Sequence, residues 1–189
     1  KMNDLQLHLN DNYIFLENYS TSEGAMSAYE GFRMESDVKA GGLNQADLTS
    51  DDMYYTKAEM KSMIQNYRKL GLDIIPEFDT PAHSLSFTKV RPDLRFGTTG
   101  RQNDHFNLNT KYDESLAFVE SIWDEYIKGD DPVFDRDTIV NIGTDEYDGQ
   151  YTEQFRKFTD DLLAYIQDNG NTVRLWGSLT ARSGSTSVR

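Results

Sequence analysis

The chain of 189 residues contains no cysteine. Disulfide bonds, thiolate catalysis and zinc sites with cysteine ligands are therefore excluded. No run of apolar residues is long enough to span a bilayer, so membrane insertion is not expected. Positive charge is also scarce, because 19 Lys and Arg face 32 Asp and Glu, a formal net charge of −13. Phosphate backbones and anionic lipids repel such a chain, which disfavours nucleic acid as a partner and leaves neutral substrates open.

The residues that are present indicate a folded domain. Aromatic residues make up 12% of the chain, with 11 Tyr and 10 Phe, which argues against disorder. The length is sufficient for one domain with a real hydrophobic core. Because the chain opens with Lys1-Met2-Asn3 inside an expected strand, we expect this N-terminus to lie within a longer protein.

Short apolar runs alternate with longer helical patterns along the chain. Strands are expected at 5–9, 72–78, 138–142 and 173–176, and helices at 56–70, 113–127 and 152–168. Thr56 and Glu59 form a capping box at the start of the first helix, and Gly71 ends it. A polar stretch from residue 10 to about residue 52 is expected to be a loop or small insertion.

Strands separated by helices predict parallel pairing with right-handed crossovers. A complete (β/α)8 barrel usually takes about 250 residues. We therefore expect an α/β fold that is a partial (β/α)8 (TIM) barrel, with about four β/α units and long βα loops. The rival is an open doubly wound sheet. No glycine-rich phosphate loop follows the first strand, which weakens the nucleotide-binding form of that rival.

Ionisable and aromatic residues gather where the expected strands end, which is the functional face of barrels and open α/β sheets. The chain places His8, Asp11, Glu77, Asp79, His83, Asp145, Glu146 and Trp176 there. Carboxylates clustered in this way are costly unless they are paired or used.

The adjacent acids Asp145 and Glu146 allow two interpretations. In an acidic chain they could be solvated loop residues. They follow an apolar strand and a glycine directly, however, which favours a functional pair. One acid could donate a proton to a leaving oxygen while the other stays ionised beside it.

The remaining candidates have structural alternatives. His83 follows a strand end closely, so a functional role and that of a satisfied core histidine both stay open. His8 lies inside its expected strand, which favours a structural role. Trp176 could be plain core or a wall for a sugar ring. His105 has no partner motif and is expected to be structural or exposed.

With these residues assembled, the chain resembles glycoside hydrolase family 20, the β-N-acetylhexosaminidases and lacto-N-biosidases. The resemblance rests on four segments: Leu7 to Asp11, Ile75 to Ser84 with its Pro-Glu-Phe-Asp-Thr-Pro-Ala-His core, Ile142 to Glu146, and Trp176. It covers residues 1–179 as a partial catalytic barrel, and residues 180–189 are left as a polar tail or the start of a loop.

The resemblance implies a substrate-assisted retaining mechanism through an oxazolinium intermediate. Glu146 would protonate the glycosidic oxygen, and Asp145 would orient the 2-acetamido group. Trp176 would help form the acetamido pocket. His8, Asp11, Asp79 and His83 are taken as substrate-binding or supporting residues. The resemblance implies no metal and no cofactor, a glycan partner that contains N-acetylhexosamine, and an extracellular or cell-surface location.

Three positions depart from the family pattern: Ala82, where glycine is usual, Asn141, where histidine is common, and Thr144, where glycine or alanine is common. They favour relatives that act on larger units, so lacto-N-biosidase activity is an alternative. Because the family's first and last strands supply further sugar-binding groups, we expect the isolated 189 residues to be inactive.

Three other classes stay open. A non-catalytic sugar-binding barrel has no need of the proton donor Glu146. A metal-dependent hydrolase could use His8, Asp79, His83 and Asp145, although closely spaced histidine pairs are lacking. A structural fragment could self-associate through exposed sheet edges.

Overall fold

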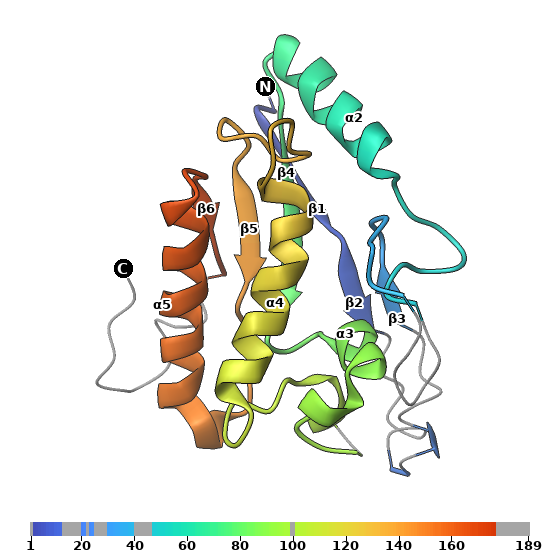
Figure 1. Ribbon diagram of the computed structural model, residues 1–189, viewed down its shortest axis with the longest axis vertical. Coiled ribbons are helices and arrows are strands. Elements are labelled where there is room, and N and C mark those ends of the chain that lie inside the picture. The colour runs from blue at the N-terminus through green and yellow to red at the C-terminus, as the bar shows by residue number, and fades with distance from the viewer. Residues whose placement is uncertain are drawn as a thin grey trace.

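The structure is a computed structural model that describes residues 2–12, 20–21, 23–24, 30–39, 47–98 and 101–176. Its main sheet has the order β1-β4-β5-β6, and every pair is parallel. The strands are β1 (Asp4–His8), β4 (Asp73–Thr80), β5 (Val140–Gly143) and β6 (Val173–Arg174). The long helices are α2 (Lys57–Lys69), α4 (Tyr112–Ile127) and α5 (Thr152–Asp168). Figure 1 shows α4 and α5 side by side along the sheet.

The expected strands and helices are all present, with small shifts of their ends. The capping box of α2 is confirmed, since Thr56 Oγ1 accepts the Glu59 N–H and Glu59 accepts the Thr56 N–H. Gly71 follows α2 with a φ of 76°, a conformation that favours glycine. The expected polar tail, residues 180–189, lies outside the described residues.

Two features were not predicted. Within the expected loop after β1, β2 (Asn10–Asn12) pairs antiparallel with β3 (Glu30–Phe32). After β4, the chain forms the short helix α3 (Leu85–Val90) and the 3-10 turns η1 (Pro92–Leu94) and η2 (Arg101–Asp104). These short elements carry too few residues to show a hydrophobic period, so sequence patterning could not separate them from loops.

The two faces of β4 differ in chemistry. Phe78 packs into the core beneath the helices, with its ring centroid 4.5 Å from that of Trp123 and 5.1 Å from that of Tyr126. Its neighbours Glu77 and Asp79 point to the other face, as strand alternation requires, and both are buried. The core and the candidate site thus lie on opposite faces of one strand.

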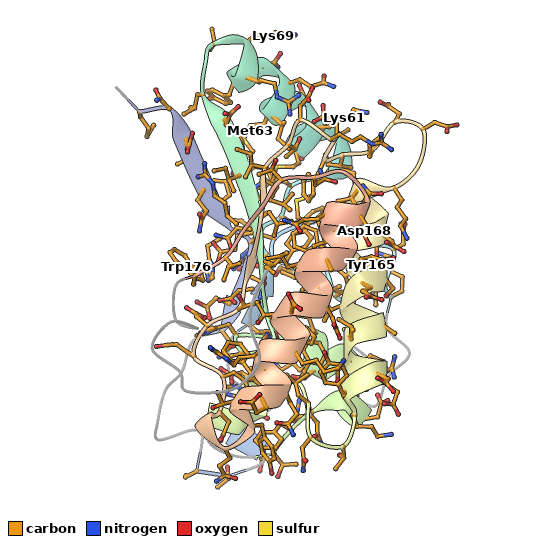
Figure 2. The ribbon with its side chains drawn as sticks, turned by 90° about the vertical axis from the view of Figure 1, so that its left-hand side faces the viewer. Lys61, Met63, Lys69, Tyr165, Asp168 and Trp176 are labelled. Carbon is orange, nitrogen blue, oxygen red and sulfur yellow. The ribbon has the colours of Figure 1, made fainter. Side chains whose placement is uncertain are left out.

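The sheet is strongly curved. Arg174 of β6 donates to Asp4 of β1 at 2.9 Å, although these are the two outer strands of the sheet. Flat strands spaced about 4.8 Å apart would separate the two backbones by about 14 Å. Figure 2 shows α2, α4 and α5 on one side of the strands, where a doubly wound sheet would have helices on both sides. The described part is therefore a curved parallel α/β sheet, and closure into a barrel stays a prediction.

In the part of the chain that the structure describes, no helix is both long and apolar enough to cross a bilayer.

Candidate active site

The site lies where the parallel strands end, at the lower end of the sheet in Figure 1. His8 is the last residue of β1, and Asp79 is the last but one of β4. The acids Asp145 and Glu146 follow the end of β5 at Gly143. Parallel pairing brings these ends together, which is why residues far apart in the sequence meet here.

The backbone after β5 takes an uncommon path. Gly143, Thr144 and Glu146 have positive φ values of 68°, 65° and 45°. The Thr144 N–H donates to the carbonyl of Thr80 at 3.1 Å and to Asp79 Oδ1 at 3.1 Å. Non-glycine residues in this conformation cost free energy and persist only where surrounding contacts hold them. The strand end and Asp79 therefore fix the direction in which the two acids leave the sheet.

The loop that carries His83 is held by a buried asparagine. Asn10 Nδ2 donates to the carbonyl of Asp79 at 2.8 Å and to that of His83 at 3.0 Å. Its Oδ1 accepts the Asp79 N–H at 2.7 Å. The chain between these residues contains a cis peptide between Thr80 and Pro81, and His83 itself has a φ of 51°. Asn10 was not predicted to belong to the site, although its place directly after an apolar strand is the signal that could have found it.

His83 is the centre of the cluster. Its Nδ1 lies 3.2 Å from Asp11 Oδ1, and its Nε2 lies 3.3 Å from both Asp145 Oδ1 and Glu146 Oε2. Burial opposes protonation of the ring, but the carboxylates of Asp11 and Asp145 outweigh it and raise the pKa of His83 to about 11. His83 is therefore an imidazolium at neutral pH that bridges Asp11 to the adjacent acids.

The two acids themselves differ in exposure. The Asp145 side chain is 24% exposed, and that of Glu146 is 72% exposed. Asp145 Oδ1 is buried, and within the described ranges it has no hydrogen-bond partner beyond the long contact with His83. A buried carboxylate oxygen in that condition is available to a donor from outside the chain.

Asp79 and Asp11 have opposite electrostatic behaviour. Burial, followed by the negative charge of Asp145, raises the pKa of Asp79 well above its ordinary value. Burial would also raise the pKa of Asp11, but hydrogen bonds from His8 and His83 outweigh it and lower that pKa. Asp11 is thus the ionised partner of two histidines, whereas Asp79 tends to keep its proton.

A second group joins β1 to the end of β6 through Glu77. His8 Nδ1 lies 3.0 Å from Glu77 Oε1, and Trp176 Nε1 donates to the same oxygen at 2.8 Å. His8 Nε2 lies 3.0 Å from Asp11 Oδ2, so the group is continuous with the His83 cluster. Hydrogen bonds to Asp11 and Glu77 raise the pKa of His8 to about 10. Trp176 is 42% exposed.

All the candidate residues are therefore brought together. They are His8, Asp11, Asp79, His83, Asp145, Glu146 and Trp176. Glu77 was noted in the sequence for its place near a strand end, but it was not assigned to the site. Its sequence signal is weak, because one acid within an apolar strand does not reveal which donors reach it.

The residue after Glu146 anchors the loop from the other side. The Tyr147 hydroxyl donates to the carbonyl of Phe106 at 2.7 Å and accepts the Leu108 N–H at 3.1 Å. Its ring stacks on His105 with centroids 4.8 Å apart. His105 was expected to be structural or exposed, and it is buried and close to Asp104, which supports the structural alternative.

Among the described residues, two sets of three side chains could hold a cation. His8, Glu77 and Asp79 form one, and Asp79, His83 and Asp145 form the other, with ligand atoms within 4.8 Å of one another in each set. Each set contains a histidine that is protonated at neutral pH, and metal ligation requires the neutral ring. A cation bound at either set would therefore have to displace the proton of its histidine.

Known proteins resemble this chain in sequence. Residues 1–174 match the sequence model of a family described as glycosyl hydrolase family 20, catalytic domain. A lacto-N-biosidase of Bifidobacterium bifidum is 24% identical over 145 residues, which are 65% of this chain and 13% of that protein. The beta-hexosaminidase subunit beta of Homo sapiens is 31% identical over 113 residues, 56% of this chain and 19% of that protein.

Solved structures share the fold. A beta-N-acetylhexosaminidase from Bacteroides fragilis superposes with a TM-score of 0.62 at 17% identity, over 98% of this chain and 37% of that one. A Flavobacterium johnsoniae chitobiase gives a TM-score of 0.65 at 16% identity, over 94% of this chain and 32% of that one. At these identities the likeness establishes the fold alone. The chain spans less than half the length of each of these relatives.

Proposed function

The chain belongs to glycosyl hydrolase family 20, and from this premise we propose that the protein that carries it removes terminal β-linked N-acetylhexosamine from glycans. The observation that carries the proposal is Asp145, whose buried Oδ1 has only the 3.3 Å ion pair with His83 among the described residues, while the adjacent Glu146 is exposed. Such a pair suits a substrate that offers an N–H donor beside a leaving oxygen.

The proposed reaction is substrate-assisted. Glu146 gives its proton to the glycosidic oxygen as the bond to the anomeric carbon breaks, and the leaving group departs as an alcohol. The carbonyl oxygen of the substrate's own 2-acetamido group attacks the anomeric carbon and forms an oxazolinium ion. Asp145 accepts the acetamido N–H and stabilises the positive charge that develops there.

In the second half of the reaction, Glu146 acts as a general base instead of a general acid. The Glu146 carboxylate takes a proton from a water molecule, which adds to the anomeric carbon and opens the oxazolinium ring with retention. His83 holds Asp145 and Glu146 through its Nε2, and Asp11 holds the other nitrogen of the ring. Trp176 supplies an aromatic wall for the acetamido methyl group.

The test uses the full-length protein, with aryl β-N-acetylglucosaminide and aryl β-lacto-N-bioside assayed side by side. Release of the monosaccharide supports the proposed activity, and release of the disaccharide supports a lacto-N-biosidase, the name that one of the relatives carries. E146Q should lower kcat by at least about 100-fold, since general acid catalysis contributes about that much or more.

A matched control is E114Q. Glu114 is an exposed acid of α4 that pairs with Lys111, the residue before the helix. We expect E114Q to leave kcat unchanged. Activity that survives E146Q at the wild-type level would exclude Glu146 as the proton donor. Binding of the sugars without any turnover would instead favour a non-catalytic sugar-binding barrel.

A further inference from the structure

Glu77 is a fully buried carboxylate in the middle of the site face. Its side chain is 0% exposed, and three donors converge on it. Oε2 accepts from Gln6 Nε2 of β1. Oε1 lies 3.0 Å from His8 Nδ1 and accepts from the indole nitrogen of Trp176 at 2.8 Å. One side chain of β4 therefore connects β1 to Trp176, two residues beyond the end of β6.

Such an arrangement is costly unless every partner is in place. An unpaired buried carboxylate is strongly disfavoured, whereas charge-assisted hydrogen bonds to it are short and strong. The imidazolium of His8 balances the charge of Glu77, and both oxygens are engaged. The carboxylate is therefore rigid, and a donor bound to it takes a fixed position.

Trp176 is the partner that needs such a support. It lies two residues beyond the end of β6, and 42% of its surface is exposed. Figure 2 shows its side chain on the side of the strands that faces away from α4. Its backbone N–H donates to the carbonyl of Gly143 at 2.9 Å, and its indole N–H donates to Glu77. These two bonds, one at each end of the residue, determine the plane of the ring.

We infer that Glu77 is a positioning residue that holds the indole of Trp176 in place and thereby sets how large a 2-acylamino group the site accepts. The inference rests on the proposed function, which makes Trp176 the wall beside the acetamido methyl group. Beyond that function, it names Glu77 as the residue that fixes this wall and the size of the accepted acyl group as the property that depends on Glu77.

The expected effect is on selectivity between substrates. In a rigid apolar pocket one additional methylene changes kcat/KM by about 10-fold or more. A fixed Trp176 should therefore favour the N-acetyl substrate over its N-propionyl and N-butyryl analogues. If the ring loses its hydrogen bond, the wall can move outward and the longer acyl groups should be accepted more readily.

The first experiment compares three aryl β-glycosides with N-acetyl, N-propionyl and N-butyryl groups in the full-length protein. E77M keeps the length of the side chain and removes both acceptors. We expect the ratio of kcat/KM for N-acetyl over N-butyryl to fall by about 10-fold. The matched control is E125M on α4, because Glu125 is a largely buried acid that accepts from Ser36 and the Asp37 N–H, away from the site.

A double-mutant cycle with W176F distinguishes a positioning role of Glu77 from general damage to the fold. If Glu77 acts through the indole N–H, E77M should change the selectivity ratio much less in the W176F background than in the wild type. Equal effects in both backgrounds, or an equal effect of E125M, would overturn the inference.

A second measurement needs neither activity nor a folded E77M protein. In the unsubstituted chain, the Trp176 indole N–H is identified as the NMR cross-peak that disappears in W176F. We expect it to lie downfield and to exchange slowly with solvent, despite the exposed ring. A rapidly exchanging, solvent-like indole signal would overturn the inference even if the protein is an active hexosaminidase. A protected signal in a protein that cleaves none of the three substrates would instead place the failure in the proposed function.

Discussion

Gly143 and Asp79 are in such close contact that no side chain can be placed on the glycine. A Cβ atom at Gly143 would lie 1.9 Å from Asp79 Oδ1 and 2.5 Å from Asp79 Cα. The φ of 68° at Gly143 independently favours glycine. The absence of a side chain at the end of β5 therefore allows Asp79 to approach the turn that carries the two acids.

We expect G143A to destabilise the protein by at least about 2 kcal/mol, because strain at positive φ is added to a clash with rigid backbone. It should also reduce kcat strongly, since Asp79 can no longer accept the Thr144 N–H in its present place. Urea denaturation and kinetics check both results.

G71A is the matched control for that substitution. Gly71 has a φ of 76°, but nothing lies within 4 Å of the position that its Cβ would occupy. G71A should lower the free energy of unfolding only by the cost of a side chain at positive φ, about 1 kcal/mol, and leave kcat unchanged. Equal losses from the two substitutions would mean that contact with Asp79 does not matter.

The sequence predicted the parts of this site that depend on strand position. Asp145 and Glu146 follow an apolar strand and a glycine, and that local pattern is enough to place them at the functional edge. It could not show that Asp79 lies inside β4 and contacts Gly143, because this contact joins residues 64 positions apart through sheet pairing. Long-range contacts of this kind are absent from local patterns.

The same limit explains the missed residues. Its place after an apolar strand makes Asn10 the expected start of a polar loop, yet it is buried and bonds both Asp79 of β4 and His83 of the following loop. Glu77 was seen as an acid near a strand end, but its donors come from β1 and from beyond β6. Alternation along β4 predicts the face that Glu77 occupies, whereas its partners depend on the register of three strands.

The raised pKa of His83 predicts that the stability of the protein depends on pH. Its pKa is raised from an ordinary value of 6.5 to about 11, so the folded state binds the proton more tightly than the unfolded state. The resulting stabilisation is complete below pH 6.5 and is lost as the pH rises toward 11. We expect the Tm of the wild type to fall between pH 7 and pH 10, and H83Q to show a shallower fall. Calorimetry at several pH values checks this, and parallel curves for the two proteins would contradict the assignment.

The position of Tyr147 beside Glu146 predicts that its hydroxyl contributes to kcat as well as to stability. Y147F removes the hydroxyl that bonds the Phe106 carbonyl and the Leu108 N–H, which keep only their 3.1 Å bond to each other, so a loss of about 1 kcal/mol is expected. Because Tyr147 is adjacent to Glu146, kcat should fall while KM changes little. The measurement combines urea denaturation with steady-state kinetics.

The control for Tyr147 is Y112F. The Tyr112 hydroxyl donates to Asp161 at 2.8 Å and joins α4 to α5 away from the site. Its loss should lower stability without an effect on kcat. A fall in kcat of the same size in both variants would show that Tyr147 acts only through global stability.

The ion pair between Asp4 and Arg174 predicts a measurable coupling between the two outer strands of the sheet. Their side chains are 39% and 43% exposed, so solvent screens the pair and the expected coupling is only about 0.2 to 1 kcal/mol. A double-mutant cycle of D4N and R174M, followed by urea denaturation, measures it, and 1 M salt should reduce it. In a flat sheet the two residues would start about 14 Å apart and show no coupling. A coupling within the expected range therefore supports the curvature that a closed barrel requires, because only a curved sheet brings the first and fourth strands within reach of one arginine side chain.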